Sequence, residues 1–348
     1  MKEKLILIDG WNIMLAQNSV ANILDFNSEP IGMYLTTINQ IRSYIDQMKP
    51  HKVVFVMDGP NAGERRRKIY SNYKNKRRVT ARTSKIKLYS EEDKKDADVY
   101  EVDGAFQKQL IKIHEFLKLL PISIVIIPYC EADDVITYIA EKNQDKYDVV
   151  ICSTDKDYLQ LINDNISVYN WRKKALFDRK RFIEDFGILP ENYVFQKVLL
   201  GDKADAIKNI KSIGDKAFQA IFQKGLLESK KETITDLFTF LNTLDKDSIE
   251  KKFQKKVDLL KEKNTQDSLL LNFRLIKLHA ENLKPHHIEI LRKQIDEQRD
   301  KGFSKLSAKL KMLNDGFNKL YGVYANAFNA DKFLQPFVFL TAKNELEV

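Results

Sequence analysis

Cysteine is almost absent from this chain, which has only Cys130 and Cys152 among 348 residues. Two cysteines cannot form a disulfide framework, so we expect a reducing, cytosolic setting. Glycine and proline are scarce as well, at 12 and 8 residues, which indicates few flexible linkers. No apolar run is long enough to span a membrane, and the run that ends at Asp9 is too short for a signal peptide. These absences leave a globular protein with no expected membrane partner.

Positive charge exceeds negative charge over the whole chain. Lysine and arginine total 58 against 49 acidic residues, which gives a formal net charge of +9. Such a balance favours a polyanionic partner such as nucleic acid. The length corresponds to two domains or to one elaborated domain.

Four short apolar runs in the first half each lead into an acidic residue. Because these runs are continuous and β-branched, and because segments 32–48 and 131–143 have helical patterns, we predict strands covered on both faces of a parallel α/β sheet. Ligands bind outside the carboxyl ends of strands in such sheets, so the acids are expected to meet at one edge. The runs are Leu5–Ile8, Val53–Met57, Ile122–Ile127 and Val149–Cys152, and the acids that follow them are Asp9, Asp58, Glu131 and Asp155.

A long charged insertion, from Glu64 to about Gln109, separates the second and third predicted strands. Its first part is rich in arginine and lysine with Tyr70 and Tyr73 interleaved, and its second part is acidic. The basic part is either a solvated helix face or a clamp that holds phosphates and stacks bases. Its position beside the acidic edge favours nucleic acid.

The second half of the chain has a helical pattern from about residue 180. Turn-forming residues around Ser212 and Gly214 interrupt it, and the lysine-rich part from Pro285 to Val348 is amphipathic. Apolar residues at helical spacing in that last part are Phe317, Leu320, Tyr321, Tyr324 and Phe328.

Nine carboxylates follow or end the predicted strands. One such aspartate alone is usually a helix N-cap or a turn residue, and Asp155 with Asp157 could form an Asx turn. Their recurrence on one edge is harder to explain in that way, because crowded carboxylates repel unless they are protonated or bind a cation. Since no Cys/His cluster has zinc spacing, the carboxylate oxygens indicate Mg²⁺ or Mn²⁺ as the bound ion. Two such ions about 4 Å apart can support phosphodiester hydrolysis. The nine are Asp9, Asp58, Glu131, Asp133, Asp134, Asp155, Asp157, Asp202 and Asp205.

Seven short motifs occur in an order that resembles the 5′ nuclease family. This family includes flap endonucleases, the 5′-exonuclease domain of bacterial polymerase I and the phage 5′ exonucleases also called phage-type ribonuclease H, and the phage branch is the most similar. The ordered set covers residues 5 to 217. The motifs are Leu7-Ile8-Asp9-Gly10, Val56-Met57-Asp58-Gly59, Tyr73-Lys74-Asn75-Lys76-Arg77-Arg78, Glu131-Ala132-Asp133-Asp134, Ser153-Thr154-Asp155-Lys156-Asp157, Gly201-Asp202-Lys203-Ala204-Asp205 and Ile213-Gly214-Asp215-Lys216-Ala217.

The resemblance implies an α/β fold with a PIN-like parallel-sheet nuclease core and a helical arch, followed by a helix-three-turn-helix motif and C-terminal helices. On this basis residues 1–185 form the core with the arch at 64–109, residues 186–285 bind DNA, and residues 286–348 are a helical extension of unassigned role. The family's ligands carry over as Asp9, Asp58, Glu131 and Asp133 near the first metal, and as Asp155, Asp157 and Asp205 near the second. Asp134 and Asp202 are expected in a supporting or water-mediated role.

The same resemblance implies the DNA contacts. Lys74 and Arg77 match arch residues that contact the scissile phosphate, and their i, i+3 spacing predicts that they face the same way from one arch helix. A candidate K⁺ site accompanies the turn at 207–217, although Ala206, Asn209 and Ser212 stand where the family has Asn and Gly. Further expected DNA contacts are Arg67, Lys68, Tyr73, Arg78, Ser212, Gly214 and Lys216.

The predicted function is a divalent-metal-dependent 5′ to 3′ exonuclease and flap endonuclease acting in replication or repair. Its substrates would be branched, nicked or RNA-primed duplex DNA with a 5′ end, and ribonuclease H activity is one form of that chemistry. Two Mg²⁺ ions, replaceable by Mn²⁺, are the expected cofactors, and a sliding clamp or single-strand-binding protein is a candidate partner. The alternatives are a PIN-type ribonuclease on single-stranded RNA and a non-catalytic DNA-junction binder.

Overall fold

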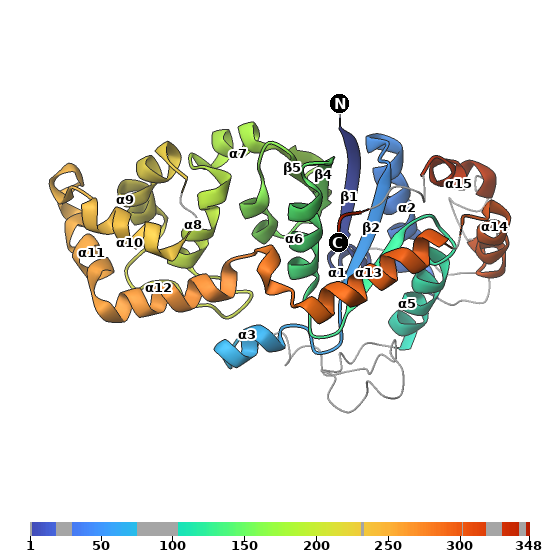
Figure 1. The fold of residues 1–348 in the computed structure, drawn as a ribbon, viewed down its shortest axis with the longest axis horizontal. Helices are drawn as coiled ribbons and strands as arrows, with labels where there is room; N and C mark the ends of the chain where they lie inside the picture. The colour runs from blue at the N-terminus through green and yellow to red at the C-terminus, as the bar shows by residue number, and fades with distance from the viewer. Residues whose placement is uncertain are drawn as a thin grey trace. The chain divides into compact units, whose positions relative to one another are not determined.

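The computed structural model describes residues 2–18, 30–74, 104–230, 233–300, 302–317, 329–340 and 346–348. These residues pack into two units (Figure 1). The first unit takes in the described residues of Met1–Ala62, Ala81–Thr154 and Ala280–Val348. The second takes in those of Gly63–Thr80 and Asp155–His279. The chain therefore passes from the first unit to the second and back again twice.

A parallel sheet forms the centre of the first unit. Its strands are β1 (Glu3–Asp9), β2 (Lys52–Asp58), β3 (Ser123–Ile127) and β4 (Tyr147–Cys152), and they lie in the order β3-β2-β1-β4. Consecutive residues of β1 and β2 are buried, and because neighbouring side chains point to opposite faces, both faces of these strands are covered. The four predicted strands and their parallel arrangement are confirmed.

Helices connect and cover these strands. They are α1 (Gly10–Asn18), α2 (Gly32–Met48), α5 (Gly104–Leu117) and α6 (Ala132–Asn143). α6 packs on β1, β2 and β4, while α2 packs against α1 and α5 (Figure 1). The predicted helices at 32–48 and 131–143 are confirmed, with Glu131 as the N-cap of α6. The far end of the charged insertion is already helical, because α5 begins at Gly104 and buries Phe106 and Leu110.

The C-terminal segment belongs to the first unit. It contains the short 3-10 turn η5 (Ala280–Asn282) and the helices α13 (Pro285–Asp300), α14 (Lys305–Asn314) and α15 (Ala330–Val338). α14 packs against α5, and α15 packs against α2. The Tyr34 hydroxyl of α2 donates to Asp315 Oδ2 at 2.9 Å, and the Tyr34 and Phe317 rings meet at a 4.8 Å centroid distance. Of the predicted amphipathic set, Phe317 is buried, and Leu320, Tyr321, Tyr324 and Phe328 lie outside the described residues.

α13 closes the outer side of β3 with a side chain in place of another strand. The Gln294 Nε2 atom donates to the Ile126 carbonyl at 2.8 Å, and the Ile126 amide donates to Gln294 Oε1 at 3.0 Å. One side-chain amide therefore satisfies both backbone groups of an edge residue, which would otherwise offer a pairing site to another strand.

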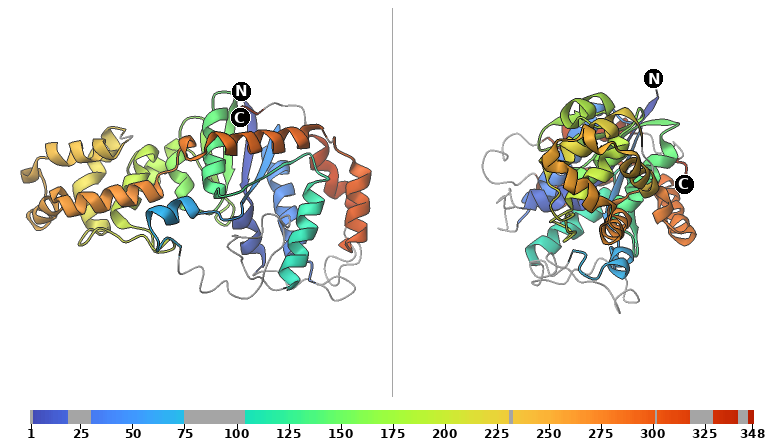
Figure 2. Two further views of the ribbon diagram at one scale, coloured as in Figure 1. Left: turned by 60° about the horizontal axis from the view of Figure 1, so that its bottom comes forward. Right: turned by 90° about the vertical axis from the view of Figure 1, so that its left-hand side faces the viewer.

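The second unit is mainly helical, as predicted from about residue 180. β5 (Ile166–Asn170) and β6 (Ala175–Phe177) form an antiparallel hairpin. The helices and 3-10 turns of this unit are α3 (Glu64–Ile69), η2 (Lys156–Leu161), α7 (Arg179–Phe186), η3 (Pro190–Asn192), α8 (Tyr193–Leu200), α9 (Asp215–Glu228), α10 (Ile234–Thr243), η4 (Lys246–Ser248), α11 (Lys251–Lys261) and α12 (Lys263–Ile276). α12 packs against α3 and α8. Figure 2 shows α10 to α12 in yellow to orange. Among the helices that the structure describes, none has the length and apolar character needed to cross a membrane.

The Gln294 contact predicts a stabilising role for the C-terminal segment. Gln294→Met keeps the length of the side chain but leaves two backbone groups of Ile126 without these partners, so we expect a loss of about 1–3 kcal/mol in the free energy of unfolding. Urea denaturation measures the loss. The matched control is Lys293→Met, which changes the exposed neighbour on the same helix. Equal stability of the two variants would contradict a role for the amide.

Candidate metal centre and nucleic-acid interface

Asp9 and Asp58 end adjacent parallel strands of the first unit, and protein donors orient both carboxylates. Asp9 accepts the Asn12 amide on Oδ1 at 3.2 Å and the Ser153 hydroxyl on Oδ2 at 3.1 Å. Asp58 Oδ1 accepts the Ala132 amide at 2.7 Å, which ties the end of β2 to the start of α6. Both side chains are thus held at the carboxyl edge of the sheet, where the sequence predicted them.

Glycine after Asp58 allows the next segment to approach closely. A Cβ atom on Gly59 would lie 1.8 Å from the Ile127 carbonyl oxygen, and the Gly59 amide donates to the Cys130 carbonyl at 3.0 Å. No side chain fits in that space. The Asp58-Gly59 pair therefore fixes the path of the chain that leads from β3 to Glu131.

Glu131, Asp133 and Asp134 form an acidic cluster at the N-terminus of α6. Each offers an oxygen, and the three atoms lie within 4.8 Å of one another. The helix N-terminus favours negative charge, yet Glu131 is only 3% exposed and Asp134 is buried as well, so three carboxylates share a space with little water. Asp134 Oδ1 accepts the Asn282 amide group at 2.8 Å. A cluster of carboxylate oxygens is the donor set that Mg²⁺ and Mn²⁺ prefer, so these residues fit a hard divalent cation.

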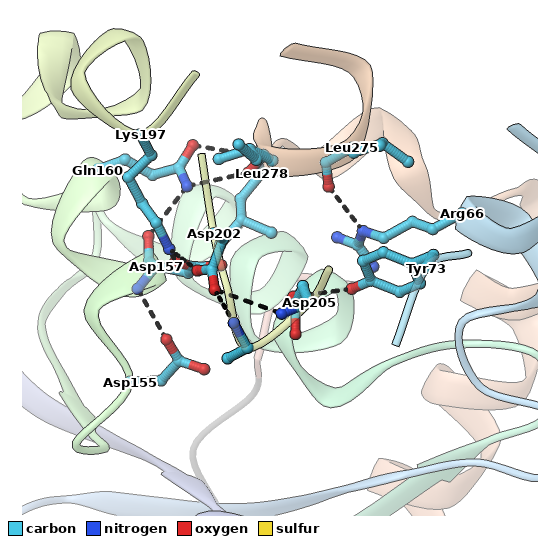
Figure 3. Close-up of polar contacts among 12 residues, drawn as sticks. Arg66, Tyr73, Asp155, Asp157, Gln160, Lys197, Asp202, Asp205, Leu275 and Leu278 are labelled. Atoms are coloured by element: carbon cyan, nitrogen blue, oxygen red, sulfur yellow. Dashed lines mark hydrogen bonds and ion pairs between the residues drawn. The ribbon is translucent and has the colours of Figure 1, made fainter. Parts of the chain in front are cut away.

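The remaining predicted ligands lie in the second unit (Figure 3). Asp155 is the N-cap of η2, and its Oδ1 atom accepts the Asp157 amide at 2.9 Å, which is the Asx-type turn that the spacing allows. Asp202 and Asp205 follow the helix α8 and not a strand, which corrects the prediction that all nine acids follow strands. The Asp202 Oδ1 atom accepts the amides of Ala204 at 2.8 Å and Asp205 at 3.3 Å. The carboxylates of the second unit therefore come from two turns. Asp155 and Asp157 lie in the turn after β4, and Asp202 and Asp205 lie in the turn after α8.

Lys197 of α8 lies between two of these carboxylates, as Figure 3 shows. Its ammonium group pairs with Asp157 Oδ1 and, at 2.8 Å, with Asp202 Oδ2. Burial alone would raise the pKa of Asp202, but the Lys197 charge and hydrogen bond and the two backbone amides lower that pKa below its ordinary value. Burial raises the pKa of Tyr193, and the negative charges of Asp155 and Asp202 raise it further. The sequence analysis did not identify Lys197, because nothing in its local sequence marks it.

Asp205 is attached to the base of the charged insertion. Its Oδ2 atom accepts the Tyr73 hydroxyl at 3.3 Å, and its carbonyl accepts the Lys74 amide at 3.1 Å. Arg66, which is 1% exposed, donates from Nε to the Leu275 carbonyl at 3.0 Å and lies 5.9 Å from the Tyr73 ring centroid (Figure 3). A buried arginine thus connects α3 to α12 beside the tyrosine that holds Asp205.

The structure corrects the predicted arch helix at Lys74. α3 ends at Ile69, and Lys74 has φ 56°, in the left-handed region, so it is a turn residue. The bonds that Tyr73 and Lys74 make to Asp205 fix this turn, and helical spacing could not reveal them. Tyr73, expected to stack on bases, is 2% exposed, with the Lys74 ammonium 5.1 Å from its ring centroid. Arg77 and Arg78 lie outside the described residues.

Two further predicted phosphate contacts lie on α3. Arg67 is half-buried, and Lys68 is exposed and pairs with Glu64 at 2.5 Å. An exposed i, i+4 pair of this kind contributes little to stability, so Lys68 can exchange Glu64 for a phosphate at small cost.

Gln160 supports the η2 turn that carries Asp157 (Figure 3). Its Nε2 atom donates to the carbonyls of Asp157 at 3.0 Å and Ile276 at 3.2 Å, and its Oε1 atom accepts the Leu278 amide at 3.0 Å. This buried amide joins Asp157 to the end of α12, a contact that no local sequence pattern predicts.

The turn between α8 and α9 presents its predicted DNA contacts to solvent. Ser212, Gly214 and Lys216 are all exposed. Gly201 begins the turn at φ 71°, and a Cβ atom there would lie 2.4 Å from the Asn209 nitrogen. Ser212 adopts a left-handed φ of 66° although it is not glycine, so the departure from the family's glycine pattern does not prevent the turn.

The carbonyls of this turn already accept bonds from side chains. Lys256 Nζ donates to the Ser212 carbonyl at 2.7 Å, and Asn209 Nδ2 donates to the carbonyls of Ile210 and Ile213, both at 3.4 Å. A K⁺ ion at the Ser212 oxygen would lie beside the Lys256 ammonium group, whose charge repels a cation. The residues present therefore do not fit a K⁺ ion at the Ser212 carbonyl.

Comparison with known proteins identifies the family. Residues 4–187 match the model of the family "5′-3′ exonuclease, N-terminal resolvase-like domain", which is more than half of the chain. The chain therefore belongs to this family, and the resemblance seen in the motifs is confirmed. A 5′-3′ exonuclease of Aquifex aeolicus is 34% identical over 188 residues, or 54% of this chain and 57% of that protein. One from Buchnera aphidicola (Schizaphis graminum) is 27% identical over 227 residues, or 64% of this chain and 71% of that protein.

Solved structures share the fold. A bacteriophage T5 protein co-crystallised with metal ions is 17% identical and superposes with a TM-score of 0.58 over 97% of this chain and 98% of that chain. Flap endonuclease-1 from Methanococcus jannaschii is also 17% identical, with a TM-score of 0.51 over 97% and 91%. The α/β nuclease fold expected from the motifs is thus shown at the level of architecture.

The acidic cluster predicts a measurable cation site. Glu131→Gln removes one buried negative charge from the three that share this space, so we expect Mn²⁺ affinity to fall about tenfold or more. Titration followed by electron paramagnetic resonance of free Mn²⁺ measures it. Asp145→Asn, which removes an exposed charge after α6, is the control and should keep wild-type affinity. Equal affinities for all three proteins would rule out the cluster as a ligand set.

Proposed function

We propose that this protein is a divalent-metal-dependent 5′ to 3′ nuclease that removes flaps or RNA primers from duplex DNA. The observation that carries the proposal is the cluster of buried Glu131 and Asp134 with half-buried Asp133 at the carboxyl edge of the parallel sheet, in a chain of the 5′-3′ exonuclease family. The Aquifex relative, of which this chain matches 57%, is a 5′-3′ exonuclease. A bacteriophage T5 flap endonuclease with the same fold was crystallised with DNA and metal ions.

The carboxylates would hold two Mg²⁺ ions, with Mn²⁺ as a substitute. In this proposal Asp9, Asp58, Glu131 and Asp133 serve the first ion, Asp155, Asp157 and Asp205 serve the second, and Asp134 and Asp202 orient their neighbours. When bound, the ions supply an activated water and stabilise the leaving oxygen of the phosphodiester. The protein's own part is orientation: backbone amides and hydroxyl groups fix Asp9, Asp58 and Asp202 before any substrate binds.

Basic residues would hold the DNA. Lys74 and Arg77 are assigned to the scissile phosphate, and Arg67, Lys68 and Arg78 to the strand beside it, whereas the buried Tyr73 holds Asp205. Ser212, Gly214 and Lys216 are exposed in the α8–α9 turn, where a helix N-terminus and a lysine suit the phosphates of a duplex. The domain division proposed is 1–185 for the core, 186–285 for duplex binding and 286–348 for the extension. A sliding clamp or single-strand-binding protein is the proposed protein partner.

The two rival functions make different use of the same fold. A non-catalytic junction binder has no need of nine carboxylates, and all nine are present. A ribonuclease on single-stranded RNA has no need of a duplex-binding turn such as the exposed one between α8 and α9. Both features favour hydrolysis of branched or primed duplex DNA.

The Asp155→Asn variant tests the proposal. Asparagine is as good an N-cap as aspartate, so η2 should keep its start, whereas the loss of charge weakens a cation site. We expect the wild type to cleave 5′-labelled flap, nicked and RNA-primed duplexes in Mg²⁺. The variant should cleave them at least a hundredfold more slowly, and its affinity for duplex in Ca²⁺ should be unchanged. Single-turnover assays and fluorescence anisotropy measure the two quantities.

Each outcome of that assay separates the candidates. Cleavage of single-stranded RNA alone would indicate the ribonuclease, and tight junction binding without any cleavage in Mg²⁺ would indicate the non-catalytic binder. Wild-type turnover by Asp155→Asn would remove Asp155 from the ligand set.

Lys74 offers a separate test of the assigned catalytic contact. Charge on the phosphate oxygens develops in the transition state, so Lys74→Ala should lower single-turnover cleavage by roughly two orders of magnitude with only a modest change in duplex affinity. Lys180→Ala, an exposed lysine of α7 that pairs with Glu184, is the control. If activity of the Lys74 variant recovered fully at saturating DNA, the lysine would contribute to binding alone.

A further inference from the structure

The position of Lys197 raises the question of what its charge does among the carboxylates of the second unit. It is the one basic residue of α8, and a lysine near a helix C-terminus is ordinarily explained by the helix dipole. Such lysines are usually exposed, since the ammonium group is strongly hydrated. The Lys197 side chain is only 12% exposed, and its two partners are 15% and 21% exposed. The dipole alone therefore does not account for its burial.

The two carboxylates differ in what else they bind. Asp202 receives two backbone amides on Oδ1 and Lys197 on Oδ2, so both of its oxygens are engaged by the protein. Asp157 contacts Lys197 through Oδ1, and its backbone is held separately by Asp155 and Gln160. Asp157 can therefore exchange its cation without disturbing the turn, whereas Asp202 anchors the lysine.

We propose that Lys197 is an internal counter-cation that competes with a divalent ion for the carboxylate of Asp157. This inference rests on the proposed function, because it takes Asp157 as a ligand of the second ion. The ammonium group offsets the repulsion among the crowded carboxylates, and it lowers the affinity of the second site for a cation. Because Lys197 pairs with Asp157, which is assigned to the second ion, we expect its effect at the second site. Lys197 is thus a positioning residue that sets an unequal affinity for two ions.

Binding of Mn²⁺ to the DNA-free protein tests the competition. Lys197→Met keeps the length and the apolar stem but removes the charge, so we expect the Kd of the weaker Mn²⁺ site to fall about fivefold or more while the tighter Kd is unchanged. Lys197→Arg keeps the charge and should retain both wild-type values within about twofold. The control Lys180→Met removes an exposed lysine of α7. Electron paramagnetic resonance of free Mn²⁺ gives both constants.

Thermal unfolding separates this role from a merely structural one. In EDTA, Lys197→Met should melt several degrees below the wild type, because the half-buried Asp157 and Asp202 lose their counter-cation, and saturating Mn²⁺ should remove most of the difference. The proposal would be overturned if the melting temperature of the variant were lowered equally in EDTA and in Mn²⁺ while the Kd of its weaker Mn²⁺ site stayed the same. Weaker Mn²⁺ binding by the variant would also overturn it. Absence of any Mn²⁺ binding by the wild type would instead refute the proposed metal centre.

Discussion

Repulsion among buried carboxylates is the constraint on which the rest of this structure depends. Negative side chains that share a poorly hydrated space must be held in place by donors or neutralised. The protein supplies a donor to each one that its contacts describe: Asn12 and Ser153 for Asp9, Ala132 for Asp58, Asn282 for Asp134, and Tyr73 for Asp205. The acids are therefore oriented by the fold itself, which is the condition for binding a cation without reorganisation.

Many of these donors come from parts of the chain that are far from the acids in sequence. Asn282 reaches Asp134 across 148 residues, and Tyr73 reaches Asp205 across 132. The C-terminal segment that supplies Asn282 also supplies Gln294, which closes the edge of β3. A segment without a recognisable motif thus contributes to the acidic edge and to the sheet that carries it. Its role is to complete the first unit.

What the sequence could and could not predict follows from the range of the interactions. β1 and β2 were predictable because continuous β-branched runs determine a buried strand locally, and Asp9 and Asp58 follow directly from where those strands end. Lys197, Gln160 and Arg66 were not, because a lysine, a glutamine and an arginine among many acquire a role only from distant partners. Lys74 was wrongly placed on a helix, since bonds from its turn to Asp205 override helical spacing.

The two groups of carboxylates are held by different means, and the difference has a chemical consequence. In the first unit Asp9, Asp58 and Asp134 accept hydrogen bonds from amides and a hydroxyl, which orient these carboxylates. In the second unit Asp157 and Asp202 share a full positive charge from Lys197. A neutral donor orients a carboxylate without cancelling its charge, whereas an ammonium group offsets that charge. In the proposed metal centre we therefore expect the two groups of carboxylates to attract a divalent ion unequally, because the groups that surround them differ.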